Sequence, residues 1–368
     1  MKKILIFCFA VFCSFQFTNA QLITSADGGS RKAMVSERIG VTDVTISYGR
    51  PGVKGREGKI WGTLVPYGFN DLNYGTSKLA PWRAGANENT TIEFSTDVKI
   101  NNMNLPAGKY GFFIAVGPTE STLIFSKNNW SWGSFFYKSS EDALRVQVKQ
   151  IPLDKSVEWL KYEFINQTPN SAVIALQWEK LMFAFKAEVD VNKTQLESFR
   201  RELQNSKGFD WQPWVQAADW CADNNTNLTE ALVWADYAIS GSFVGERNFK
   251  TLAAKARLLS MGGNSNESAL LMKEALLLGS MIQIHGYARQ LLTSNRITEA
   301  AEVFKYNYKK YPNQFTTNMG MARALSSEGN YKGAIVYATA ALPQAPDAAN
   351  KQFVKDIINK LIAGKDIN

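Results

Sequence analysis

Eight residues between positions 50 and 88 have side chains that could hold a small ligand. They are Arg50, Arg56, Trp61, Tyr67, Trp82, Arg83, Asn87 and Glu88. Arginine can grip both oxygens of a carboxylate or phosphate, and a tryptophan face suits a sugar or a cation. The pattern predicts a pocket for a small molecule or a glycan. The alternative is structural: Trp61 and Trp82 fill the core, and Arg83 pairs with Glu88 to tie down loops.

A second set of candidate residues lies in the back half of the chain. An Ala-Arg pair occurs three times, at spacings of 32 and 34 residues, and supplies Arg257, Arg289 and Arg323. In a helix, His285 and Met319 would lie one turn earlier on the same face. A row of three arginines at repeat spacing predicts a groove for an extended partner that carries carboxylates. The alternative is that these arginines are solvated or paired with acids of neighbouring helices.

The sequence contains no recognisable catalytic constellation. The only histidine, His285, falls in the back half, and the chain has no Gly-x-Ser-x-Gly, Ser-x-x-Lys or His-Glu-x-x-His motif. We therefore expect no catalytic residues, no metal and no cofactor. The alternative is a hydrolase acting on glycans or peptides, with carboxylates that the fold gathers near Trp82–Glu88.

The first 20 residues, MKKILIFCFAVFCSFQFTNA, read as an export signal. Lys2 and Lys3 precede an apolar run shorter than the roughly 20 residues of a membrane-spanning helix, and small residues close the segment. We expect cleavage after Ala20, which places the mature chain in the periplasm or outside the cell with no integral membrane span. Only Cys221 lies beyond the signal, so no intramolecular disulfide can form.

Length and composition allow two or three domains, because 368 residues at 45% hydrophobic content can bury sizeable cores. The formal net charge of +8 is spread thinly and forms no long basic run. An exported chain also has little access to nucleic acid. We therefore exclude a nucleic-acid partner.

The front half has the hydrophobic period of strands. Val44, Ile46 and Tyr48 alternate with polar residues, and further strands are expected at 91–95, 98–100, 110–116, 122–125, 144–148, 157–165, 172–178 and 183–191. Many short strands without intervening helices predict an antiparallel β-sandwich or jelly-roll-like domain over residues 21–192.

Near Val191 the period changes from two to that of helices. The segment Thr194–Glu197 reads as a capping box, so residues 193–212 are expected to form a linking helix and a loop. Apolar residues then recur at a spacing of three and four. This spacing predicts helices at 213–223, 228–240, 249–260, 266–278, 282–294, 298–310, 315–327, 331–342 and 349–363, all within a domain at 213–368.

The helical region resembles a tetratricopeptide repeat array. Like residues stand 34 positions apart in three pairs: Ala288 and Ala322, Ala300 and Ala334, Pro312 and Pro346. Small residues allow paired helices to approach closely, and a proline cannot continue the second helix. The resemblance covers about 213–346, is most specific over 282–346, and implies a surface for a peptide or protein. A non-repeat helical bundle is the alternative.

A series of ordered motifs marks the front half. They include Ile46-Ser47-Tyr48-Gly49-Arg50-Pro51, Trp82-Arg83-Ala84-Gly85-Ala86-Asn87-Glu88, Leu105-Pro106-Ala107-Gly108 and Trp132-Gly133-Ser134-Phe135. Together they resemble the bacterial secreted domain-of-unknown-function 2911 family over about residues 30–189. The resemblance implies an exported all-β domain with no established activity. Residues 69–81 and the repeat array depart from the shorter family pattern.

These observations favour recognition over catalysis. We expect an exported scaffold whose helical repeats dock a peptide or protein partner in the cell envelope. We expect the β domain to bind a small ligand or to act as a partner surface.

Overall fold

The computed structural model describes residues 29–368, so the predicted signal peptide at 1–20 lies outside the described part. The chain divides into two compact units, with the boundary between Gln195 and Leu196. The first unit is built from strands and the second from helices. Each is described on its own below.

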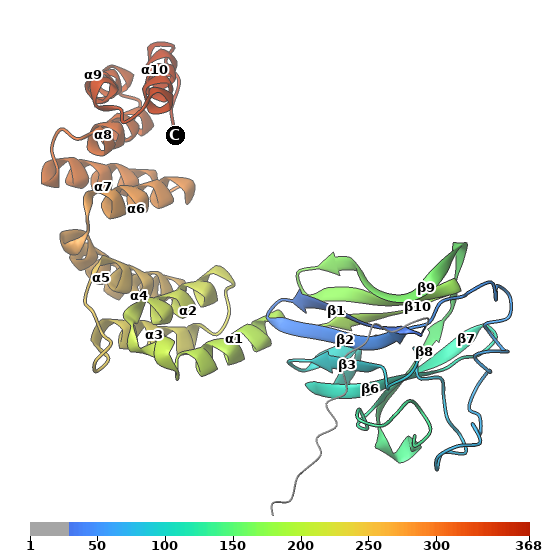
Figure 1. Cartoon of the computed structure of the whole chain (residues 1–368). Helices are drawn as coiled ribbons and strands as arrows, with labels where there is room; N and C mark the ends of the chain where they lie inside the picture. The colour runs from blue at the N-terminus through green and yellow to red at the C-terminus, as the bar shows by residue number, and fades with distance from the viewer. Residues whose placement is uncertain (1–28) are drawn as a thin grey trace, which may run out of the picture. The chain divides into compact units, whose positions relative to one another are not determined.

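The β unit contains two antiparallel sheets (Figure 1). In spatial order, the six-stranded sheet consists of β1 (Arg31–Ile39), β2 (Thr42–Arg50), β3 (Thr91–Phe94), β6 (Gly108–Ala115), β7 (Glu120–Ser126) and β8 (Asp142–Lys149). The four-stranded sheet consists of β5 (Met103–Leu105), β4 (Val98–Ile100), β10 (Ser171–Glu188) and β9 (Ile151–Thr168). The predicted antiparallel all-β architecture of this region is confirmed.

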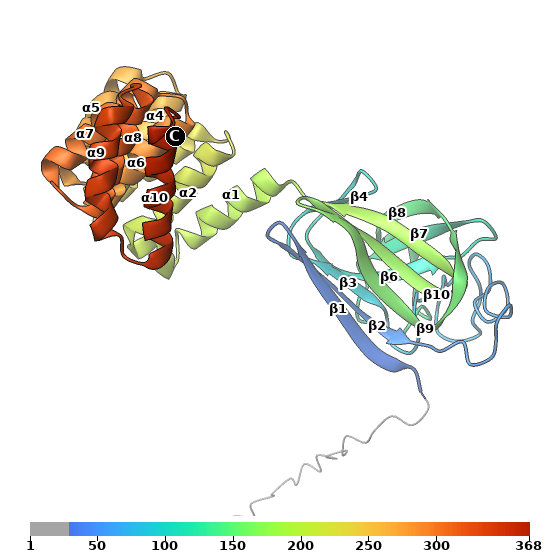
Figure 2. The same cartoon turned by 90° about the horizontal axis from the view of Figure 1, so that it is seen from above.

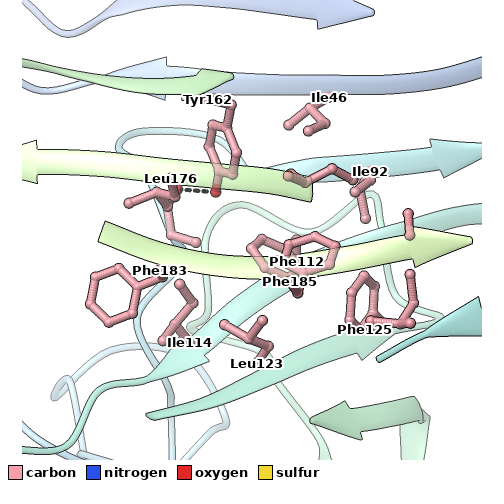
Figure 3. Packing of buried hydrophobic residues seen from close by; sticks show 14 of the residues in the cluster. Ile46, Ile92, Phe112, Ile114, Leu123, Phe125, Tyr162, Leu176, Phe183 and Phe185 are labelled. Atoms are coloured by element: carbon pink, nitrogen blue, oxygen red, sulfur yellow. Dashed lines mark hydrogen bonds between the residues drawn. The ribbon is translucent and has the colours of Figure 1, made fainter. Parts of the chain in front are cut away.

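Large aromatic side chains from both sheets form one continuous core (Figure 3). Phe112 on β6 and Phe125 on β7 each have their ring centroid 5.6 Å from that of Phe185 on β10. Because burying one such ring stabilises the fold by about 1.5–3 kcal/mol, this cluster is the main source of cohesion between the sheets.

The long strand β10 corrects the prediction of two strands at 172–178 and 183–191. The structure joins them through an irregularity at Glu179, which has a positive φ of 51° and interrupts the register with β9. A bulge of this kind adds a residue to one strand and bends it without ending it. The broken alternation of the sequence therefore reflects a bulge inside one strand.

The linking segment also differs from the prediction. Helix α1 (Val191–Glu202) begins before Thr194, so the expected capping box at Thr194–Glu197 is wrong. Asp190 supplies the cap, because its Oδ1 accepts a hydrogen bond from the backbone N of Lys193 at 3.0 Å. Thr194 lies within the first turn, where its hydroxyl donates to the Asp190 carbonyl.

Nine further helices form the second unit (Figure 2). They are α2 (Trp211–Asp223), α3 (Leu228–Ser240), α4 (Phe249–Met261), α5 (Ser265–Leu278), α6 (Met281–Thr293), α7 (Ile297–Lys310), α8 (Phe315–Ser327), α9 (Tyr331–Ala341) and α10 (Ala348–Ile362). Each was predicted, and its ends differ from the prediction by two residues at most.

Consecutive helices pack as pairs: α2 with α3, α4 with α5, α6 with α7, and α8 with α9. The first helix of a pair also contacts the first helix of the next pair, as α2 does with α4 and α6 with α8. Ala288, Ala300, Ala322 and Ala334 are completely buried, so the small residues stand where the helices approach most closely. These contacts establish the predicted tetratricopeptide-like array.

Within residues 29–368, none of the helices combines the length and the apolar character that crossing a bilayer requires.

Candidate functional site

A pocket of about 350 Å³ opens among the loops of the β unit. Its charged lining residues are Arg56 and Arg83, and its walls include Trp82 and Trp178. The remaining residues are small, apolar or neutral: Ser30, Pro51, Leu64, Val65, Pro66, Asn70, Leu72, Ala80, Pro81, Gly85, Ala86 and Ser134. Over residues 29–368, the lining thus carries two positive charges and no acidic side chain.

Arg83 is held in place from several sides. Its Nη1 donates to the Asn87 carbonyl at 2.6 Å, and its guanidinium carbon lies 4.7 Å from the centre of the Phe135 ring. The backbone of Gly133 approaches so closely that a Cβ there would lie 2.3 Å from that guanidinium carbon. Burial lowers the pKa of Arg83. Among the described residues, no carboxylate forms an ion pair with it.

Arg56 is anchored by backbone carbonyls in the same way. Its Nε donates to the Val53 carbonyl at 2.8 Å, and its Nη2 donates to the Gly52 carbonyl at 2.7 Å. Within residues 29–368 this arginine, too, has no acidic partner. The two guanidinium groups are thus oriented without having their charge neutralised.

Three tryptophans build the aromatic side of the pocket. Trp82 stacks on Trp178 with ring centroids 6.0 Å apart, and Trp61 meets both rings edge-on at 5.6 and 5.7 Å. The indole N–H of Trp61 donates to Glu179, and that of Trp82 donates to the Gly85 carbonyl. Trp178 differs: it is 1% exposed, and its Nε1 is buried with no hydrogen-bond partner in the described structure.

The loop that carries Trp82 and Arg83 is fitted against the end of β2. A Cβ on Gly49 would lie 2.0 Å from the Ala86 carbonyl oxygen, so only glycine allows this approach. The hydroxyl of Tyr162 donates to the Ala84 carbonyl at 2.8 Å from the opposite sheet. The motifs around Gly49 and Ala84–Ala86 therefore meet in space, which gives a physical reason for their occurring together.

The structure brings only part of the eight-residue prediction together. Arg56, Trp82 and Arg83 line the pocket, and Trp61 packs behind its tryptophan wall. The other four residues have different surroundings: Arg50 donates to the Leu160 carbonyl, Asn87 donates to the Ser30 carbonyl, Glu88 lies 3.7 Å from Lys32, and Tyr67 is exposed. The alternative pairing of Arg83 with Glu88 is not formed.

Sequence reasoning missed most of the pocket lining. Ser134 comes from the loop before β8, and Trp178 from β10. Trp178 was placed in a predicted strand, but nothing in the local sequence showed that its ring would stack on Trp82. Gly133 and Ser134 belong to the motif Trp132-Gly133-Ser134-Phe135, and this was the only feature of the sequence that could have suggested a role for them.

The segment at 69–81 contributes one side chain, Phe69, to a cluster on β6 and β7. Phe69 packs with Phe113 and Tyr137 in a separate cluster outside the main core. Beneath it, Tyr137 and Arg145 both donate to Oδ2 of Asp142, at 2.7 and 2.6 Å. Burial raises the pKa of Asp142. This polar cluster does not line the pocket; it touches the segment at 69–81 through Arg145, whose guanidinium carbon lies 5.5 Å from the centre of the Phe69 ring.

The helical unit contains a larger groove of about 1130 Å³, bordered by α2, α4, α5, α6 and α7. Its apolar lining is formed by large side chains, including Trp211, Trp220, Phe249, Met272 and Tyr287. The charged residues along it are Asp219, Asp223, Lys250, Arg257, Lys273, Arg296, Glu299 and Glu302. The groove is therefore amphipathic along its length.

The three predicted arginines do not form an open row. Arg257 lines the groove and pairs with Asp223 at 2.6 Å, as the alternative reading expected. Arg323 is only 7% exposed, and its Nη1 donates to the Ile367 carbonyl at 3.1 Å. Burial, aided by the positive charge of Arg289, lowers the pKa of Arg323 to about 10. Of the three arginines, only Arg289 is exposed.

His285 and Met319 also lie away from the lining of this groove. Met319 is 5% exposed and belongs to an apolar cluster of the array. His285 packs against Phe304, and its buried Nδ1 has no hydrogen-bond partner in the described structure. Burial and the charges of Arg323 and Arg289 lower the pKa of His285 to about 4. The neutral imidazole is therefore the form that the fold holds.

Neither the remaining thiol nor the acidic side chains form a reactive centre in the described part of the chain. Cys221 is buried, and burial raises the pKa of its thiol to about 11, which disfavours the reactive thiolate. Over residues 29–368, no group of three or more His, Cys, Asp or Glu side chains is arranged to hold a metal ion.

Residues 30–187 match the model of the family described as "Protein of unknown function (DUF2911)". The resemblance predicted for the front half is thereby confirmed over these residues. Among curated proteins none matches the chain.

Solved structures of repeat proteins are similar to the helical region. The crystal structure of YrrB, described as a TPR protein with an unusual peptide-binding site, is 17% identical, with 46% of this chain and 89% of that chain covered and a TM-score of 0.28. The Cut9–Hcn1 hetero-tetramer of APC/C is 13% identical, with 47% and 35% covered and a TM-score of 0.29. A putative kinesin light chain of Podospora anserina is 14% identical, with 47% and 85% covered and a TM-score of 0.28.

Proposed function

We propose that this protein is an exported, non-catalytic recognition scaffold whose helical array docks an extended segment of a partner protein. The observation that carries the proposal is the groove of about 1130 Å³, which is long, amphipathic and built by five helices. Stacked helix pairs form extended surfaces of this kind by repetition of one unit. The β unit offers a second recognition site, the loop pocket described above.

Charge complementarity defines the occupant of the groove. Two of its cationic residues have acidic partners: Arg257 pairs with Asp223, and Arg296 pairs with Glu299. Lys250 and Lys273 also line the groove, and within residues 29–368 neither ammonium group has a carboxylate partner. Glu302 lines the groove as well, and within residues 29–368 it forms no ion pair. The docked segment is therefore a peptide that places apolar side chains on the aromatic lining, carboxylates beside these lysines and no carboxylate beside Glu302.

A peptide display selection on the full chain tests this proposal. We expect enrichment of sequences that combine acidic and apolar residues, and weaker binding of the enriched peptides as salt is added. Replacing Lys250 and Lys273 together by Glu should weaken the binding of those peptides about tenfold or more. Lys351 and Lys355 on α10 are exposed and lie outside the groove lining, so the same double reversal there is the matched control.

Two results would contradict the proposal: selection without enrichment, or enriched peptides that bind the Lys250→Glu/Lys273→Glu variant as tightly as the wild type. Fluorescence polarisation with labelled peptides gives the affinities. Circular dichroism of the variants shows whether the array has kept its helices.

Export is the remaining part of the proposal. It rests on the order of basic, apolar and small residues in the first 20 positions. Mass spectrometry of the protein recovered from the cell envelope should find Gln21 at the N-terminus, whereas an intact Met1 on cytoplasmic protein would contradict export.

The hydrolase alternative is not favoured by the pocket. Glycoside hydrolysis needs two carboxyl groups that flank the substrate. The described lining of the β-unit pocket contains no aspartate or glutamate. Its chemistry is that of binding.

A further inference from the structure

We infer that the pocket of the β unit binds a small organic acid, with a carboxylate held by Arg56 and Arg83 and a flat apolar body against Trp82 and Trp178. This inference rests on the small-ligand part of the proposed function and specifies its chemistry. It is independent of the peptide groove.

Uncompensated positive charge is the first reason. Arg56 and Arg83 both line the pocket. Within residues 29–368 their guanidinium groups donate hydrogen bonds only to backbone carbonyl oxygens. A partly buried charge without a counter-charge is costly, and burial already lowers the pKa of Arg83. A bound carboxylate would accept hydrogen bonds from these guanidinium groups and neutralise part of their charge.

The second reason is the unused donor on Trp178. Its side chain lines the pocket and is almost completely buried, yet its Nε1 has no acceptor in the described structure. Buried N–H groups are nearly always paired, so an isolated one calls for an explanation. Because this nitrogen exposes almost no surface, a ligand oxygen reaches it only by entering the wall of the pocket beside the ring, where it would supply the missing acceptor.

Preorganisation is the third reason. The Arg83 guanidinium is confined by the Phe135 ring, the backbone of Gly133 and the Asn87 carbonyl. A side chain that is already fixed loses little conformational freedom when a ligand binds. Fixing a side chain in this way costs conformational entropy. A residue that only covers a surface gains nothing from that cost, whereas a residue that binds an anion gains affinity.

The shape and composition of the pocket define the rest of the ligand. A volume of about 350 Å³ lies at the lower end of the roughly 300–1,000 Å³ usual for small-molecule sites. Pro51, Leu64 and Pro81 add apolar surface to the stacked Trp82 and Trp178 rings. Such walls favour a single flat or ring-shaped body over a bare inorganic anion.

Direct binding to the full-length protein tests the ligand class. The probes are benzoate, indole-3-acetate and glucuronate, each beside its uncharged amide, together with inorganic phosphate. We expect at least one organic acid to bind by calorimetry, with its amide about tenfold weaker or more. Equal binding of acid and amide would overturn the inference. So would the absence of binding by all three acids, or binding of inorganic phosphate alone.

Two glycine substitutions test the position of the site. Gly133 and Gly329 both have positive φ, 57° and 75°, so alanine strains the backbone similarly at either position. Only at Gly133 would the new Cβ meet the Arg83 guanidinium; nothing lies within 4 Å at Gly329, which is outside the pocket lining. We expect Gly133→Ala to weaken the acid about tenfold or more and Gly329→Ala to change its affinity less than about twofold.

Arg83→Gln and Trp178→Phe complete the set, because each removes one proposed donor to the ligand. Arg83→Gln should weaken the organic acid more than its amide, because it removes a charged donor. Trp178→Phe should weaken both, because an amide oxygen also accepts from an indole N–H. Near-ultraviolet circular dichroism reports whether the β unit remains packed, and Arg83→Gln keeps the test valid if Gly133→Ala disturbs folding. Unchanged acid binding in both Arg83→Gln and Gly133→Ala would overturn the inference. Peptide binding to the array, measured on the same variants, would stay intact in that case, which separates this failure from failure of the groove.

Discussion

The two units of this chain build their interiors in opposite ways. The β unit has one large core in which aromatic rings from both sheets interlock, as Phe112, Phe125 and Phe185 do. The helical unit divides its buried residues among several small clusters, many of them lined by alanine. The core of the β unit therefore joins residues that are far apart in the sequence, whereas each cluster of the helical unit joins residues of neighbouring helices.

The same difference governs the two candidate sites. The β-unit pocket draws on residues from Ser30 to Trp178 and holds its arginines in fixed positions. The groove of the array is assembled from three neighbouring helix pairs, through α2, α4, α5, α6 and α7. The first arrangement suits a small ligand of defined shape, and the second suits an extended segment with several weak contacts.

The largest expected effect would test whether the two interiors are independent. Phe125 in the β unit and Phe304 in the array are both completely buried. Replacing either by Ala should cost about 3–5 kcal/mol of unfolding free energy in its own unit, because a cavity remains. Calorimetry should show one transition shifted and the other unchanged. Val336→Ala, at a position that is 64% exposed, is the control. A single transition shifted by both phenylalanine variants would refute independence.

An intermediate effect should depend on pH and belong to the array alone. In the fold the pKa of His285 is lowered from 6.5 to about 4 by burial and by Arg323 and Arg289. Between these two pH values the unfolded chain binds a proton on His285 and the folded chain does not. Protonation therefore favours the unfolded chain, so the free energy of unfolding is highest above pH 6.5 and decreases as the pH falls toward 4. The slope is about 1.4 kcal/mol per pH unit, or roughly 3 kcal/mol in all.

Urea unfolding at several pH values, followed by helical circular dichroism, measures this slope. The His285→Gln variant lacks the titrating group and is the reference, since the carboxylates of the array titrate in both proteins. Equal pH dependence in the two proteins would show that the imidazole is not held in its neutral form.

The smallest effects on stability are expected for ion pairs. Breaking an exposed pair in the array should cost less unfolding free energy than breaking a buried pair in the β unit. In the array, Arg257 and Asp223 have side chains that are 35% and 63% exposed, so Arg257→Gln should cost less than about 1 kcal/mol. In the β unit, Asp142 is 8% exposed and shared by Arg145 and Tyr137. Arg145→Gln should cost more, about 1–3 kcal/mol, because it leaves a buried carboxylate poorly compensated. Chemical denaturation in low and high salt compares the two, and the reverse order would contradict this reading.

The array was more predictable than the pocket for a physical reason. Helical periodicity and the 34-residue spacing of Ala288 and Ala322 report contacts between neighbours in the chain, and these are visible in a single sequence. Arg323 shows the limit: its position in the repeat was readable, but its burial beneath Ile367 depends on how the C-terminal residues fold back. Likewise, the bulge at Glu179 appeared in the sequence only as an interruption between two strands.

By itself, the sequence determined the two classes of unit, the order of their elements and the candidate arginines and tryptophans. Hydrophobic periods carry that information because they arise from residues a few positions apart. Tertiary structure alone decided that Arg83 would lie between Phe135 and Gly133, that Trp178 would stack on Trp82, and that Glu88 would turn to Lys32 instead. Those contacts join distant parts of the chain, and their geometry depends on the packing of both sheets at once.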